Sequence, residues 1–276
     1  MITPTEPRVD GYESFYREFD SPLMHQLRRE AYGEDIGQHS WVSATELRGD
    51  IQRLGLSPAS RLLDLGCGPC GPLTFMIKAT GCHGTGIELS PSALQVGRTR
   101  AITLGIESLF FTQEADLNDP LPFGAESFDA VASLDVVLHL RDRARLFHDV
   151  ARLLPAGGRF LLTDAGVITG PISNEEVRKR SVHGYTQFVT PGWNEQLLAA
   201  AGFRLVESED RTASVLRNAS GRLAAMNAHR PELEQLSGAS AVTRQQDYLE
   251  TLVDLSKRHV VSRFMYLAEV NKPGGF

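Results

Sequence analysis

Residues 62–71 read Leu62-Leu63-Asp64-Leu65-Gly66-Cys67-Gly68-Pro69-Cys70-Gly71, and this stretch decides the fold. An apolar run ends in an acidic residue and passes into G-x-G just before a helical pattern. Glycines let the backbone turn tightly and let a ligand approach where a Cβ would otherwise stand. The stretch therefore predicts a strand, a ligand-binding turn and a helix in immediate succession.

Outward from this stretch, short apolar runs alternate with helical patterns. Strands are expected at 61–65, 83–89, 109–113, 128–134, 159–163, 203–208 and 263–270, and helices at 72–79, 91–104, 143–154 and 193–201. Such alternation requires crossover connections between strands. We therefore expect an α/β fold with a doubly wound, mainly parallel, seven-stranded sheet and helices on both faces.

Three stretches fall outside this alternation. They are an N-terminal helical arm or lid (1–55), a substrate-lid insert (166–192) and a helical insert at about 212–260. We expect the core to comprise 56–165 and 193–276, with the extra stretches forming a helical cap over the carboxyl edge of the sheet. Open α/β sheets bind ligands at that edge.

Charge and composition limit the partners. The 276 residues carry a net charge of −6, with no long basic run, so we expect no nucleic-acid partner. No apolar run reaches the roughly 18–20 residues that span a bilayer, and the N-terminus lacks a secretory signal, so we expect no membrane partner. We expect a cytoplasmic monomer or homodimer.

Cys67 and Cys70 form a C-x-x-C, and Cys82 is the third cysteine. A redox site would place this pair at a helix start without a competing glycine motif, and a zinc site would add a second pair or histidines at ligand spacing. Because neither context is present, we expect reduced thiols and no metal.

Two classes of cofactor remain open for the glycine turn. Gly66, Gly68 and Gly71 also satisfy the G-x-G-x-x-G of a nicotinamide-binding loop. Glu88, twenty residues after Gly68, closes the second strand, where an acid binds the ribose hydroxyls in both classes. The glycines and this acid therefore cannot decide between them.

The following motifs separate the two classes. The order DLGCG (64–68), GIELS (86–90), ADL (115–117), PLPF (120–123), SFDAV (127–131) and LLPAGGRFLLTD (153–164) resembles class I, Rossmann-like S-adenosylmethionine-dependent methyltransferases of small molecules. The resemblance is strong over about 55–165. It implies that S-adenosyl-L-methionine is the cofactor and that a small molecule is the methyl acceptor.

The resemblance also implies which residues bind the cofactor. Asp64, Gly66, Cys67 and Gly68 would line its methionine part, and Glu88 would hold the ribose. The resemblance places Leu89, Asp116 and Leu117 around the adenine, and the backbone around Leu134 under the sulfonium. Taken alone, Asp116 would equally suit a solvated loop.

Methyl transfer requires an in-line acceptor and removal of its proton, so a base is expected where strands four and five end. His139 follows strand four, at the place of an H-H-x-x-D element, and Asp164 ends strand five. We predict that His139 accepts a proton and that Asp164 orients a donor or polarises the substrate. His139 could instead cap the next helix or pack on the core.

The arm and the lid supply further candidates. Residues 32–41 (YGEDIGQHSW) are similar to a W-G-E-N-L-H-x-G-Y-W element that, with an upstream tyrosine, closes over the cofactor in related enzymes. We therefore assign Tyr16 and Trp41 to cofactor binding and His39 to the substrate. Aromatic and polar residues alternate over 181–188 of the lid, which suggests that His183 and Tyr185 contact the substrate, with a packed lid core as the alternative. Tyr16 could instead belong to a helix face packed on the core.

Together these features predict methyl transfer to an oxygen or nitrogen, less readily a carbon, of a small molecule. The alternatives are a NAD(P)-dependent oxidoreductase and a protein that binds the cofactor without methylating. The ADL and PLPF segments and the lack of a Tyr-x-x-x-Lys pair weigh against the oxidoreductase.

Overall fold

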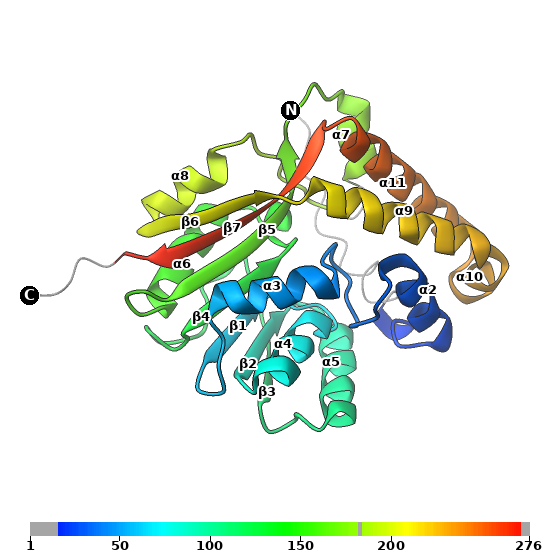
Figure 1. Ribbon diagram of the computed structural model, residues 1–276. Coiled ribbons are helices and arrows are strands. Elements are labelled where there is room, and N and C mark those ends of the chain that lie inside the picture. Colours follow the sequence, from blue (N-terminus) through cyan, green and yellow to red (C-terminus); the bar gives the residue numbers. More distant parts are fainter. Residues whose placement is uncertain (1–15, 182–183, 272–276) are drawn as a thin grey trace, which may run out of the picture.

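The sheet has seven strands in the order β3-β2-β1-β4-β5-β7-β6 (Figure 1). The computed structural model describes residues 16–181 and 184–271. The first five strands in the chain run parallel, whereas β7 is antiparallel to both β5 and β6. Their bounds are β1 Arg61–Leu65, β2 His83–Glu88, β3 Phe110–Glu114, β4 Ala130–Leu134, β5 Arg159–Ile168, β6 Phe203–Asp210 and β7 Val261–Val270. The doubly wound, mainly parallel sheet predicted from the sequence is confirmed.

Helices cover both faces of this sheet. Side chains alternate along β1, so Leu62 packs into the core on one face and Leu63 and Leu65 pack on the other. The first face is covered by α3 (Ala44–Leu54), α4 (Gly71–Thr80) and α5 (Pro91–Leu104), and the second by α6 (Arg143–Leu153) and α8 (Trp193–Ala200).

Strand five is longer than the five residues predicted. It continues from Thr163 to Ile168, with an irregularity in its pairing to β7 between Asp164 and Val167. Nearly every residue of this strand is buried, so its second half lacks the polar alternation that marks a strand in a sequence. The stretch predicted as a lid insert therefore begins with strand.

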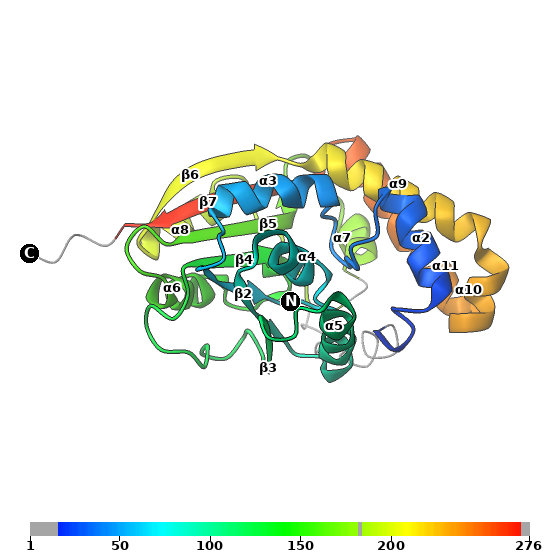
Figure 2. The ribbon, with the colours of Figure 1, turned by 60° about the horizontal axis from the view of Figure 1, so that its bottom comes forward.

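The remaining helices gather beyond one end of the sheet (Figure 2). They are α2 (Pro22–Tyr32), α7 (Asn174–Arg180), α9 (Thr212–Ala228), α10 (Arg230–Ser237) and α11 (Ala239–Lys257), which we call the cap. In α9, a Cβ on Gly221 would stand 2.5 Å from the carbonyl oxygen of Ala31, so the missing side chain lets α2 and α9 approach closely. No helix within the described residues is long and apolar enough to cross a membrane.

The third glycine of the loop has a packing role. A Cβ on Gly71 would lie 2.0 Å from the carbonyl oxygen of Gly37 and 2.5 Å from that of Ile36. The arm backbone therefore rests directly on the first turn of α4. This close approach accounts for Gly71 without a nicotinamide cofactor, although the sequence pattern fits one.

Replacing Gly71 by alanine is expected to lower the free energy of unfolding by about 1–3 kcal/mol, because the arm backbone must move away from α4. Urea denaturation measures this change. Gly49→Ala is the matched control, since its Cβ would meet only the tip of the Arg53 side chain. That variant should be unchanged or slightly more stable. Equal stability of the two variants would contradict the packing role of Gly71.

Candidate functional site

A cavity of about 830 Å³ lies where the carboxyl ends of β1 to β5 meet the cap. All but two of the site residues predicted from the sequence line it. The exceptions are Asp164, which is buried elsewhere, and His183, which lies outside the described residues. The cavity brings together residues that are far apart in the chain, from Tyr16 to Tyr248.

The loop after β1 presents bare backbone to this cavity. Gly66 and Gly68 have φ values of +70° and +51°, a conformation that side chains disfavour. A Cβ on Gly68 would stand 3.4 Å from the hydroxyl of Tyr16, within the space between the loop and the arm. This glycine cradle suits the close approach of a nucleoside cofactor.

Three acidic residues mark the same end of the cavity. The Glu88 carboxylate accepts hydrogen bonds from the backbone N–H groups of Gly68 (3.0 Å), Leu89 (2.9 Å) and Ser90 (3.0 Å), which fix its orientation. At the end of β3, Oδ1 of Asp116 accepts the backbone and side-chain N–H groups of Asn118. The residues present thus fit the ribose and adenine of S-adenosylmethionine.

Asp64 is the most buried of these acids, with 2% of its surface exposed. Burial and the neighbouring charge of Glu88 raise the pKa of Asp64 to about 7. The carboxyl group therefore ionises near neutral pH. A ligand that carried a positive charge to this place would favour the ionised form.

Apolar side chains complete the cofactor end. Leu89 keeps 39% of its surface exposed at the cavity, which is unusual for a leucine beside a binding loop and suits contact with a flat ring. Leu117 and Leu134 are largely buried and also line the cavity. Cys67 also lines the cavity as a free thiol, its Sγ 3.4 Å from that of Cys70.

His139 ends the short 3-10 helix η1 (Val137–His139) and lines the cavity. Its Nδ1 lies 3.1 Å from the carbonyl oxygen of Tyr185, which can only accept, so Nδ1 donates. The neutral ring therefore leaves its lone pair on Nε2. Burial lowers the pKa of His139, so the ring is neutral at physiological pH.

Asp164 does not reach the cavity, and the prediction that it acts on the substrate is corrected. Its carboxylate is fully buried, 2.7 Å from Nη1 of Arg143 and 2.9 Å from the amide nitrogen of Asn194. Arg143 also donates to the carbonyl oxygen of Gln187 at 2.9 Å. Because Gln187 follows Tyr185 closely, this ion pair fixes the segment whose carbonyl orients His139.

The arm closes one side of the cavity. Tyr16 places its hydroxyl 3.0 Å from Nδ1 of His39, and both rings pack against Phe19. Trp41 is held at both ends, since its N–H donates to Asp135 and its carbonyl accepts from Asn218. Tyr16 therefore packs against neighbouring rings, as the alternative interpretation predicted, and it also lines the cavity.

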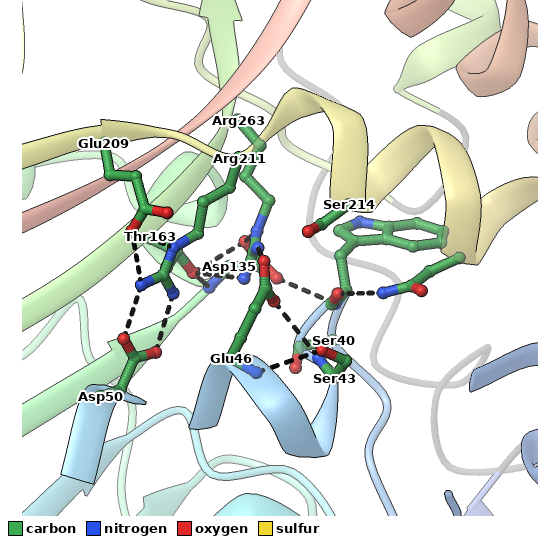
Figure 3. A network of polar contacts seen from close by, with 12 residues as sticks. Ser40, Ser43, Glu46, Asp50, Asp135, Thr163, Glu209, Arg211, Ser214 and Arg263 are labelled. Atoms are coloured by element: carbon green, nitrogen blue, oxygen red, sulfur yellow. Dashed lines mark hydrogen bonds and ion pairs between the residues drawn. The ribbon is translucent and has the colours of Figure 1, made fainter. Parts of the chain in front are cut away.

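Figure 3 shows the polar network beneath the arm. Arg263 of β7 is 1% exposed and donates through Nε to Oδ1 of Asp135 at 2.7 Å, while its Nη1 lies 3.2 Å from Glu46 of α3. Asp135, at φ +63°, also accepts from Thr163 (2.8 Å) and from the Trp41 N–H (2.9 Å). Beside it, Arg211 pairs with Asp50 at 2.6 Å.

The sequence analysis did not identify this network. Its members come from β7, α3, the arm and the turn after β4, and no local motif connects them. The available signal was an arginine inside an otherwise apolar strand (VSRFMYLAEV), which requires a buried partner.

No group of three histidine, cysteine, aspartate or glutamate side chains suited to a metal ion occurs within 16–181 and 184–271.

The fold and the cavity define a Rossmann-like protein with a nucleoside-cofactor site. Residues 63–162 match the family described as a methyltransferase domain. Phosphoethanolamine N-methyltransferase 1 of Zea mays is 30% identical over 206 residues, 75% of this chain and 40% of that protein. The chain thus spans well under two thirds of the maize protein's length. The 27-O-demethylrifamycin SV methyltransferase of Amycolatopsis mediterranei matches at 29% identity over 65% of this chain and 66% of that protein. Sterol 24-C-methyltransferase ERG6B of Gibberella zeae matches at 28% identity over 76% of this chain and 58% of that protein.

Two solved structures share the fold. Haemonchus contortus phosphoethanolamine N-methyltransferase 2, in complex with phosphomonomethylethanolamine and S-adenosylhomocysteine, has a TM-score of 0.79 at 18% identity, covering 95% of this chain and 60% of that one. The [4+2]-cyclase SpnF has a TM-score of 0.74 at 21% identity, covering 98% of each chain. Residues 63–162 thus form a methyltransferase domain, and the two solved structures show that the whole described chain has the fold they share.

Asp64→Asn is expected to stabilise the ligand-free protein at pH 8. The folded pKa of about 7 lies above the ordinary 3.8, so ionisation of Asp64 disfavours folding increasingly as the pH rises between those values. The substitution should therefore add roughly 1–4 kcal/mol at pH 8 and less near pH 4. It should also weaken binding of S-adenosylhomocysteine at pH 8, because the ligand's ammonium group loses an ionised partner.

Thermal melts and calorimetric titrations at both pH values measure these effects. The exposed Asp119→Asn is the matched control and should change neither quantity. A destabilised Asp64→Asn variant at pH 8 would contradict the raised pKa.

Asp135→Asn is expected to lower the free energy of unfolding by about 3–5 kcal/mol, because it leaves the buried Arg263 charge without its closest partner. The double variant Asp135→Asn/Arg263→Met should recover part of that loss. Urea unfolding measures both, with the exposed pair Glu175–Lys179 as control. Glu175→Gln should leave the unfolding midpoint unchanged. Strict additivity of the two core changes would refute the pairing.

Proposed function

We propose that this chain transfers the methyl group of S-adenosylmethionine to an oxygen or nitrogen of a small acceptor bound between the sheet edge and the cap. One observation carries the proposal. A single cavity joins the glycine cradle and Glu88 at one end with His139 and the cap helices at the other. Cofactor and acceptor can therefore lie in one continuous cavity.

The cofactor end would hold the donor by its separate parts. Asp64 and the Gly66–Gly68 backbone are placed for the methionine part, Glu88 for the ribose, and Leu89, Asp116 and Leu117 for the adenine. Bound S-adenosylmethionine supplies a methyl group on a positively charged sulfur, which needs no further activation. The protein's task is then to orient the acceptor and to remove its proton.

His139 is suited to that removal. Its Nδ1–H is held by the Tyr185 carbonyl, and its Nε2 forms no hydrogen bond within the described part of the chain. The lowered pKa keeps the ring neutral, so the Nε2 lone pair is available at physiological pH. A hydroxyl or ammonium group needs such a base, and this requirement favours oxygen or nitrogen over carbon.

Relationship alone does not fix the acceptor atom or the chemistry. Related proteins are named for N-, O- and C-methylation, and the fold is shared with a [4+2]-cyclase. Fold does not dictate reaction. The proposal therefore rests on His139 and the continuous cavity. A protein that binds the cofactor without methylating would have no need of a neutral, oriented imidazole.

The test combines binding with turnover. S-adenosylhomocysteine should bind in calorimetry while NAD(H) and NADP(H) do not, and labelled S-adenosylmethionine should methylate members of a panel of phenols, amines and carboxylic acids. His139→Gln should lower kcat by roughly 100-fold or more without weakening cofactor binding. The wild-type rate should fall as the pH drops below the lowered pKa of His139.

His148→Gln, an exposed position on α6, is the matched control and should keep full activity. Wild-type activity of His139→Gln at every pH would exclude His139 as the base. Labelling on carbon would correct the acceptor atom, and absence of S-adenosylhomocysteine binding would overturn the proposal entirely.

A further inference from the structure

Arg180, the last residue of α7, is buried in the cavity wall, and no carboxylate of residues 16–181 or 184–271 pairs with it. It is 3% exposed. Its Nη1 donates to the Tyr248 hydroxyl at 2.8 Å and its Nη2 to the Ala165 carbonyl at 3.3 Å. Nε is buried and forms no hydrogen bond within the described residues. A guanidinium stays charged at all relevant pH values, so these neutral partners leave its charge uncompensated.

The other buried arginines of the described chain show how unusual this is. Each of them lies within 2.7 Å of a carboxylate oxygen, in the pairs Arg28–Asp35, Arg143–Asp164, Arg211–Asp50 and Arg263–Asp135. The same chain thus supplies a counterion wherever an arginine serves only the structure. Arg180, which lines the cavity, receives none from the described residues.

Charge is also divided along the cavity. The acids Asp64, Glu88 and Asp116 line the cofactor end. The lining residues that belong to the cap helices include Arg222 and Arg244 as well as Arg180, and among those described none is acidic. Arg222 lies 5.0 Å from the Trp41 ring, where a cation–π contact leaves its charge in place. The cap end is therefore positive in a chain whose net charge is −6.

We propose that Arg180 binds an oxyanion of the methyl acceptor, a carboxylate or a phosphate. This inference rests on the proposed function and specifies its acceptor. A planar guanidinium matches either oxyanion with two parallel hydrogen bonds, and Nε is one of the donors of that fork. The anion would take the place of the missing counterion, with the cap arginines adding long-range attraction.

The position of Arg180 connects this anion to His139. The positive charge of Arg180 lowers the pKa of His139, while the charges of Asp164 and Asp135 raise it. A bound oxyanion neutralises Arg180 and removes the opposing influence. His139 then becomes a stronger base when the acceptor is in place, so proton removal is linked to occupancy of the cap end.

Calorimetry on the full chain saturated with S-adenosylhomocysteine tests the proposal, with inorganic phosphate, inorganic pyrophosphate and benzoate as probes at constant ionic strength. At least one probe should bind saturably, and the set distinguishes phosphate from carboxylate chemistry. Arg180→Gln should weaken that binding by roughly tenfold to hundredfold. Arg178→Gln, an exposed arginine of the same helix, should bind the probe as the wild type does.

A second measurement needs no variant. The pKa of His139, followed by NMR in the wild-type protein, should rise when the binding probe is added. This readout keeps the proposal testable if Arg180→Gln does not fold, because Arg180 also holds α7 to Tyr248.

Several results would overturn the proposal. They are failure of every probe to bind wild-type protein, wild-type probe affinity in a folded Arg180→Gln variant, and probe binding that leaves the pKa of His139 unchanged. A lower melting temperature of Arg180→Gln with unchanged probe binding would assign Arg180 a structural role only. Failure of S-adenosylhomocysteine to bind, in contrast, would count against the proposed function itself.

Discussion

The ion pair between Arg263 and Asp135 is the constraint on which the site depends. A fully buried guanidinium is costly unless it is paired, and here its partner is the residue directly after β4, which has a left-handed backbone conformation. That residue also accepts from Thr163 and from the Trp41 backbone, so one carboxylate joins β4, β5, β7 and the arm. The turn it fixes leads directly into η1, and so the position of His139 follows from it.

A second buried ion pair also helps to fix the position of His139. Asp164 and Arg143 hold the Gln187 segment, whose neighbour Tyr185 receives the His139 N–H. The imidazole is therefore placed by two separate ion pairs, of which Arg143–Asp164 lies outside the cavity lining and Arg263–Asp135 reaches it only through Asp135. Such pairs tolerate burial because both charges and most donors are satisfied, and their removal would move the base.

The sequence predicted the sheet, the strand positions and the glycine turn of the cavity because those features are local. The apolar run at 61–65 and the glycines at 66 and 68 depend only on neighbouring residues. Asp164 shows where that reasoning stops. An acid at a strand end is indistinguishable, in sequence, from one that faces a ligand, and only the approach of Arg143 from another helix decides. The role of Gly71 likewise depends on the arm, which lies over thirty residues earlier in the chain.

The two ends of the cavity carry opposite charges that the described protein does not compensate. Asp64 is buried beside another acid, and Arg180 is buried beside neutral oxygens. Each arrangement lowers the stability of the ligand-free fold, because a desolvated charge lacks a partner. A cation at the first end and an anion at the second would each relieve one of these penalties. Binding of the two ligands would therefore restore the stability that the ligand-free fold lacks. The opposite charges at the two ends would also select a cation at one end and an anion at the other. His139 lines the same cavity, and an anion that neutralised Arg180 would also increase the basicity of His139.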